Sequence, residues 1–208
     1  MTWIKGEYAP VFYKKGRFTC LKPCNFWLSL VTDRPNKGWD AALLRICTWV
    51  RLQETVTDRI FSFFNLHLDH IGVTARKESV KLVLNKINEI CGDEPVILTG
   101  DFNVDQHNES YILLKNSNQL ADTYDLAKIR YAQSGTLNGY NINRHNDNRI
   151  DHIFVSSGFE VIRYGIFINR HLPRHYIFPS TVAFRSFTCE SGTQLKIEFL
   201  EKKCLFYA

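Results

Sequence analysis

A segment with helical periodicity lies between two apolar runs, and this order constrains the fold more than any other feature of the sequence. Residues 74–91 have apolar side chains at the spacing of one helix face, with Thr74 as a candidate N-terminal cap and Gly92 just beyond the end. These side chains are Val80, Val83, Leu84, Ile87 and Ile90. The flanking runs, residues 59–66 and 96–99, have the length and apolar character of buried strands. The order predicts a sheet with covering helices, in either an α/β or an α+β arrangement.

Weaker patterns predict the remaining elements. Strands are expected at residues 8–13, 18–21, 26–30, 46–52 and 149–155, with an edge strand at 195–199. A short helix is expected at residues 109–117, and the Pro and Gly at residues 33–38 indicate a loop.

Polar side chains follow the apolar runs. Asp101 and Asn103 come directly after one run, and alternation along a strand places both on the same side. This arrangement suits a site for a hard cation and a phosphate oxygen, although a turn followed by a helix cap has the same composition. His67 ends the other run, and Asp151 lies in the strand expected at residues 149–155.

Composition limits the class of protein. An apolar content of 45% excludes a disordered chain, and 208 residues are enough for one domain with a substantial core. We find neither an apolar run of about 18 residues nor a signal-peptide pattern, so an intracellular protein without a membrane span is expected. The six cysteines lack metal-binding spacing and are expected to be reduced. The net charge of +5 is compatible with a polyanionic partner and is also ordinary for a soluble domain.

Several longer motifs resemble the endonuclease/exonuclease/phosphatase family, which includes pancreatic deoxyribonuclease. They are GEYAPVFY at residues 6–13, FWLS at 26–29, GWDAA at 38–42, RICTW at 45–49, NLH at 65–67, GDFN at 100–103 and RIDHIF at 149–154. The resemblance covers residues 6–180 and is greatest to uncharacterised metal-dependent hydrolases of this family. It implies an α/β or α+β fold: a deoxyribonuclease-like two-sheet sandwich with flanking helices.

The resemblance also implies roles for individual residues. His67 would contact the scissile phosphate, Asn103 would stabilise its oxygens, and Asp101 would position the attacking water. Asp151 would orient a general-base histidine. Arg45 would grip the substrate, with a structural pairing to an acidic residue as the alternative. Asp101 and Asn103 would hold Mg²⁺ or Mn²⁺ weakly, and Asp69 and His70 are expected to shape the loop after His67.

Two departures from the family pattern weaken the functional expectation. The strand that ends in the metal-binding Glu is not found before Gly6, and Gln53-Glu54 stands in the wrong order to replace it. The family's Asp-His pair is not found after Ser180, and His175 would need a local rearrangement to act as the base. The sequence is therefore interpreted as a family-like domain at residues 1–180, lacking N-terminal strands, with a divergent tail at 181–208.

This interpretation leaves two functional hypotheses. The chain is a phosphoester hydrolase with impaired activity, a phosphodiesterase, nuclease or phosphatase acting on a phosphate ester, with nucleic acid among the candidate substrates. Alternatively, it is a noncatalytic remnant that binds a partner or has no function. Strands missing from a sandwich would also leave an open sheet edge, through which the chain could self-associate.

Overall fold

A six-stranded sheet forms the centre of the first of two compact units. The computed structural model describes residues 8–132, 135–137 and 146–167, together with residues 181–182, 187–188 and 194–195. The first unit comprises Met1–Asp122 and His152–Ser157, and the second comprises Thr123–Asp151 and Gly158–Ala208. Each unit is described by itself.

The sheet of the first unit has the strand order β1-β2-β3-β4-β7-β5. Its strands are β1 (Phe18–Trp27), β2 (Ile46–Glu54), β3 (Ile60–His67), β4 (Val96–Asp101), β5 (Ala121–Asp122) and β7 (Asp151–Val155). β1, β2 and β3 are antiparallel neighbours, whereas β3 and β4 are parallel. The parallel register pairs Ser62 with Val96 and His67 with Asp101, so the two polar ends meet.

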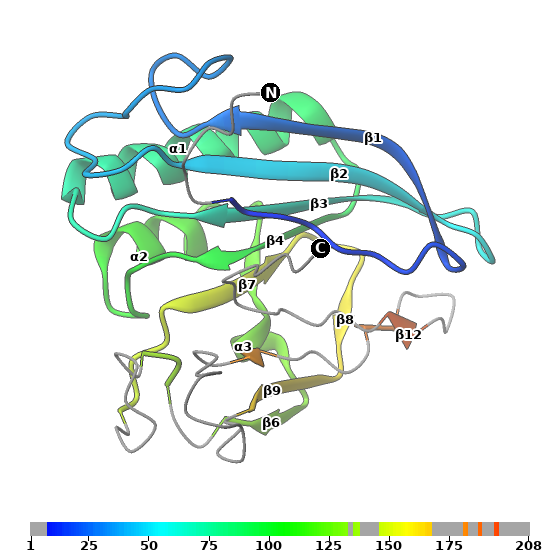
Figure 1. Cartoon of the computed structure of the whole chain (residues 1–208). Coiled ribbons are helices and arrows are strands. Elements are labelled where there is room, and N and C mark those ends of the chain that lie inside the picture. Colours follow the sequence, from blue (N-terminus) through cyan, green and yellow to red (C-terminus); the bar gives the residue numbers. More distant parts are fainter. Residues whose placement is uncertain are drawn as a thin grey trace, which may run out of the picture. The chain divides into compact units, whose positions relative to one another are not determined.

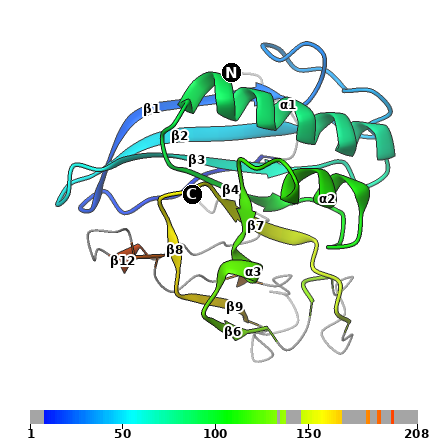
Figure 2. The same ribbon diagram turned by 180° about the vertical axis from the view of Figure 1, so that it is seen from behind.

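Two helices cover one face of this sheet. α1 (Val73–Cys91) connects β3 to β4, and α2 (Glu109–Lys115) follows β4. They lie behind the sheet in Figure 1 and in front of it in Figure 2. The core between them contains Phe64, which is fully buried and stacks on Trp49 with 5.8 Å between ring centroids. The apolar periodicity of α1 and the two central strands were all predicted, and the structure confirms them.

The N-terminus of α1 is held by a carboxylate from another part of the chain. Gly72 occupies the N-cap position and supplies no side-chain acceptor, so the prediction of Thr74 as the cap was wrong. Asp40 accepts hydrogen bonds from the backbone N–H groups of Thr74 (3.2 Å) and Ala75 (2.6 Å). It thereby satisfies two of the donors that a helix leaves unpaired at its start.

Gly100 allows β3 and β4 to approach each other at the position just before Asp101. A Cβ atom at this glycine would lie 2.2 Å from the carbonyl oxygen of Leu66, which belongs to the β3 backbone. Any larger residue would therefore push the two strands apart. The Gly-Asp motif thus sets the distance between strands as well as delivering a carboxylate.

The second unit contains short elements. They are α3 (Thr123–Leu126), β6 (Ile129–Tyr131), β8 (Glu160–Val161), β9 (Arg163–Phe167), β10 (Thr181–Val182), β11 (Phe187–Thr188) and β12 (Gln194–Leu195). The strands among them form two three-stranded sheets, β10-β9-β6 and β12-β11-β8. The mixed α+β class expected from the sequence is confirmed.

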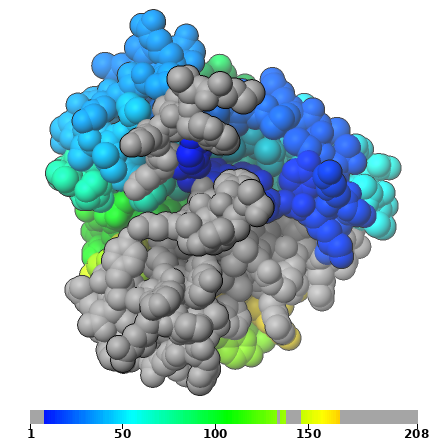
Figure 3. Space-filling model, in the orientation of Figure 1, coloured from blue at the N-terminus to red at the C-terminus, as the bar shows by residue number. Residues whose placement is uncertain are grey.

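Two strand predictions were wrong. Residues 8–13 form no strand, and the two strands expected at residues 18–21 and 26–30 are one strand, β1, with an irregular register between Cys20 and Lys22. β1 is the end strand of its sheet, and its residues 21–25 are exposed. The N-terminal part of the chain, coloured blue, is visible on the surface in Figure 3. Among the described residues, no helix has the length and apolar character needed to cross a membrane.

Candidate active site

His67 and Asp101 form a pair at the carboxyl ends of β3 and β4. Their side chains lie on the sheet face opposite the helices, because β3 and β4 turn Phe64, Leu66 and Leu98 toward the helical core. The His67 Nε2 atom lies 3.5 Å from the Asp101 Oδ2 atom. Both side chains keep access to solvent, with 32% of His67 and 14% of Asp101 exposed. An incoming anion can therefore reach both groups.

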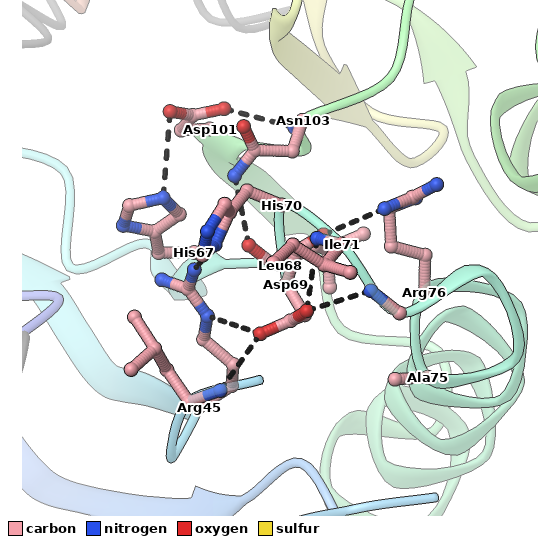
Figure 4. Close-up of polar contacts among 12 residues, drawn as sticks. Arg45, His67, Leu68, Asp69, His70, Ile71, Ala75, Arg76, Asp101 and Asn103 are labelled. Carbon is pink, nitrogen blue, oxygen red and sulfur yellow. Dashed lines mark hydrogen bonds and ion pairs between the residues drawn. The ribbon is translucent and has the colours of Figure 1, made fainter. Parts of the chain in front are cut away.

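Asn103 is fixed next to this pair by two hydrogen bonds (Figure 4). Its backbone N–H donates to Asp101 Oδ1 (2.9 Å), and its side-chain Nδ2 donates to the carbonyl oxygen of Leu68 (2.9 Å). The N–H of Leu68 in turn donates to the carbonyl oxygen of Asp101 (2.9 Å). Asn103 adopts a positive φ of 51°, which asparagine tolerates better than most residues. Of the four residues expected from the sequence to converge, this geometry brings His67, Asp101 and Asn103 together, and the convergence of Asp151 with them stays a prediction.

Two buried polar side chains, Asn65 and Thr99, are hydrogen-bonded to each other next to the site. Asn65 and Thr99 lie one step back along β3 and β4 and face each other in the parallel register. The Thr99 hydroxyl donates to Asn65 Oδ1 (3.2 Å), and Asn65 Nδ2 donates to the carbonyl oxygen of Pro10 (2.9 Å). The Asn-x-His motif therefore provides one structural and one exposed side chain.

Asp69 holds the loop that follows β3. Its Oδ1 atom accepts from the N–H groups of Ile71 (3.0 Å) and Gly72 (2.7 Å), and its Oδ2 atom accepts from the N–H of Leu43 (3.1 Å). Burial by itself would raise the pKa of this carboxyl group. The backbone hydrogen bonds outweigh burial, and they hold the pKa of Asp69 well below its usual range.

Arg45 is buried next to Asp69. Only 4% of the residue is exposed, its Nε atom lies 3.4 Å from Asp69 Oδ2, and its Nη2 atom lies 3.1 Å from His70 Nδ1. The guanidinium is thus paired with an acidic residue, as the structural alternative expected, but this pair is buried and does not lie at the surface. A role in gripping the substrate stays a prediction. What the sequence could not indicate is that Asp69, Arg45 and His70 form one connected group (Figure 4).

Asp151 begins β7 and is buried, with 2% of the residue exposed. Within the second unit, its backbone N–H donates to the hydroxyl of Thr136 (3.0 Å). His152, which follows it, belongs to the first unit, where its Nε2 atom lies 2.9 Å from the carbonyl oxygen of Val104. The role of Asp151 in orienting a base stays a prediction. The candidate base His175 and the Ser180 segment lie outside the described residues.

The residues present make an incomplete site for a hard cation. Asp101 offers one carboxylate and Asn103 one amide oxygen, whereas Mg²⁺ takes about six oxygen ligands, some of them waters. In the part of the chain that the structure describes, there is no group of three or more His, Cys, Asp or Glu side chains arranged to hold a metal. These residues alone do not fit a tightly held ion.

The mixed sheet, the covering helices and the polar cluster at the ends of β3 and β4 define an α+β protein with a candidate phosphate site. Residues 26–180 match the model of the endonuclease/exonuclease/phosphatase family. The chain belongs to this family. Enzymes of the family are generally metal-dependent.

Individual relatives agree with this assignment. A mannosyl-6-phosphatase of Bacteroides thetaiotaomicron is 43% identical over 84% of this chain and 61% of its own, with a TM-score of 0.73. Another solved structure of the family from the same organism is 41% identical over 90% of this chain and 63% of its own, also with a TM-score of 0.73. An uncharacterised protein of Acanthamoeba polyphaga mimivirus is 32% identical over 68% of this chain and 54% of its own. The chain therefore spans between half and two thirds of the length of these relatives.

Proposed function

We propose that this chain hydrolyses a phosphate ester at the site formed by His67, Asp101 and Asn103. The observation that carries the proposal is the parallel register, which pairs His67 with Asp101 where two central strands end. The pairing brings together two residues that are far apart in the sequence, and both side chains remain accessible to solvent. Exposed, preorganised donors can bind a phosphoryl group, and a carboxylate next to them can orient a water molecule.

Each residue has a role that its contacts allow. The imidazole of His67, whose Nε2 atom lies 3.5 Å from Asp101 Oδ2, donates a ring N–H hydrogen bond to a phosphoryl oxygen as negative charge develops on it. Asn103 uses one amide hydrogen for Leu68 and keeps the second for a phosphoryl oxygen. Asp101 accepts a hydrogen bond from the attacking water and thereby orients it. The water oxygen forms a bond to phosphorus, the ester P–O bond breaks, and the proton that the water loses ends on the leaving oxygen.

The remaining parts of the site are proposed from the family. A divalent cation, Mg²⁺ or Mn²⁺, would supply charge neutralisation at the phosphate, and Asp101 and Asn103 would hold it only weakly. Asp151 would orient a base, and Arg45 would contribute to substrate binding. Because the Asp-His pair is replaced by Thr181-Val-Ala-Phe, we expect turnover reduced by about 100-fold to 10,000-fold, the usual contribution of a general base.

A second candidate function is phosphate-ester binding without turnover. The replacement of the Asp-His pair favours it, and so does the finding that the described residues include no group of three or more His, Cys, Asp or Glu side chains that could hold a metal. Under this hypothesis His67 and Asn103 still bind a phosphate group, whereas Asp101 takes part in no reaction.

We propose a sugar phosphate monoester as the substrate class. The support is the 43% identity to a mannosyl-6-phosphatase. Nucleic acid is the alternative, and a net charge of +5 is compatible with it. Substrates of both classes therefore belong in the test.

The test measures phosphate release from mannose 6-phosphate and cleavage of a generic phosphodiester and of single-stranded DNA, each with Mg²⁺ and with Mn²⁺. The chain is compared with Asp101→Ala and His67→Ala, and the matched controls are Asp93→Ala and His107→Ala at exposed positions. Turnover that is lost in both site variants and kept in both controls supports hydrolysis. Turnover that is the same in Asp101→Ala contradicts it. Phosphate binding that depends on His67, without turnover on any substrate, supports the second candidate.

A further inference from the structure

A second imidazole, His70, lies three residues after His67 and has no part in the hydrolysis proposed above. Its side chain is exposed, and its Nδ1 atom lies 3.1 Å from Nη2 of Arg45. Arg45 is itself buried and lies 3.4 Å from Asp69. Figure 4 shows this group at the same strand ends as Asp101 and Asn103.

The contact with Arg45 determines which ring nitrogen of His70 carries the proton. A guanidinium has only donors and stays protonated in proteins, so the Nδ1 atom of His70 has to accept. The neutral ring then carries its hydrogen on Nε2. Arg45 cannot turn away easily, because its side chain is buried and Asp69 binds the same guanidinium. The buried pair therefore fixes an exposed N–H donor, as partners behind metal-binding histidines fix a tautomer.

We propose that His70 is a substrate-contacting residue that donates Nε2–H to an oxygen of the phosphate ester, and that Arg45 and Asp69 are its positioning residues. The inference rests on the proposed function, because it assumes that a phosphate binds next to His67. It adds a donor that the family resemblance does not assign. In this arrangement Arg45 contributes to substrate recognition by orienting His70, and Arg45 itself does not contact the substrate.

The test is nuclear magnetic resonance of the full chain labelled with ¹⁵N in histidine, because the ring ¹⁵N shifts report the tautomer without any need for turnover. His70→Gln identifies the His70 signals. We expect His70 to be the Nε2–H tautomer, and we expect Arg45→Met to release it into exchange between both tautomers. A His70 ring that carries its hydrogen on Nδ1, or that exchanges freely in the unaltered chain, would overturn the proposal.

Titration with inorganic phosphate then tests the contact. We expect shifts at both His67 and His70, and a dissociation constant about 10-fold to 100-fold weaker in His70→Ala, the factor for one hydrogen bond to a charged group. His70→Gln, which keeps an N–H at a similar position, should recover part of this loss, and His107→Ala serves as the exposed-histidine control. Phosphate that shifts His67 but not His70 refutes the inference and leaves the proposed function standing. Phosphate that shifts neither ring overturns both.

Discussion

Replacing Asp69 by asparagine removes one negative charge from the loop after β3 while keeping the size of the side chain. The amide oxygen of the new side chain can still accept from Ile71 and Gly72, whose N–H groups lie at 3.0 and 2.7 Å from the Asp69 carboxylate. The amide nitrogen then faces Leu43 N–H and the Arg45 guanidinium, which are both donors. The change therefore removes the Asp69 carboxylate from its ion pair with the buried Arg45 guanidinium.

The size of the effect follows from burial. The Asp69 and Arg45 side chains are 1% and 3% exposed, so solvent does little to screen the pair. Removing one partner of a buried ion pair costs about 3–5 kcal/mol, and this range already includes most of the lost hydrogen bonding. Domains of ordinary size have a free energy of unfolding of about 5–15 kcal/mol. We therefore expect Asp69→Asn to lose a large share of the stability.

Urea unfolding at pH 7, followed by the fluorescence of the four tryptophans, measures this loss. Asp93→Asn is the matched control, because Asp93 is exposed and the same chemical change should alter stability by less than about 0.5 kcal/mol. A loss below about 1 kcal/mol in Asp69→Asn, or an equal loss in both variants, would refute the reasoning.

A double-mutant cycle identifies the cause. If the loss of the ion pair between Asp69 and Arg45 dominates, then Arg45→Met should cost less stability in the Asp69→Asn background than in the unaltered chain. Additive effects of the two substitutions would mean that Asp69 acts only through the backbone N–H groups.

Four further measurements test other parts of the fold. The low pKa of Asp69 contributes stability that is present above about pH 4, the ordinary value for an unfolded chain, and is lost as the pH falls further. The stability difference between the chain and Asp69→Asn should therefore narrow between about pH 5 and pH 3 in urea titrations. Phe64→Ala should cost about 3–5 kcal/mol in the same assay, because the ring is fully buried, and a loss under about 1 kcal/mol would contradict this packing. Gly100→Ala should lower both stability and phosphate affinity through its clash with β3, whereas Gly16→Ala, with open space around it, should lower neither. Gel filtration at increasing concentration tests the self-association expected through an open sheet edge, and a constant monomer would refute it.

Apolar runs predicted β3 and β4, and the helical spacing of apolar side chains predicted α1. Such patterns failed where distant residues decide the outcome. Thr74 has the composition of a cap, but Asp40 satisfies the helix N-terminus from 34 positions away in the chain. The two strands expected at residues 18–21 and 26–30 are one strand, because pairing with β2 continues from Phe18 to Trp27 across a register shift between Cys20 and Lys22, and an end strand tolerates Pro23.

The candidate site was predictable to a similar extent. His67, Asp101 and Asn103 stand at the ends of predicted strands, so their convergence follows once the strands are parallel neighbours. The register that pairs His67 with Asp101 depends on the close approach at Gly100, which no local pattern reveals. The burial of Arg45 was not predicted, because its partners Asp69 and His70 come from a loop whose path is set by backbone hydrogen bonds.

The parallel pairing of β3 and β4 also determines when this site comes into existence during folding. His67 and Asp101 lie on opposite sides of α1 in the chain, so they meet only after the helix has carried the backbone from one end of the sheet to the other. Parallel pairs of this kind require loop closure before any contact is gained, which makes their formation slow. A short peptide that contains either motif therefore carries no site. A transplant of this chemistry into another protein would have to move β3, α1 and β4 together.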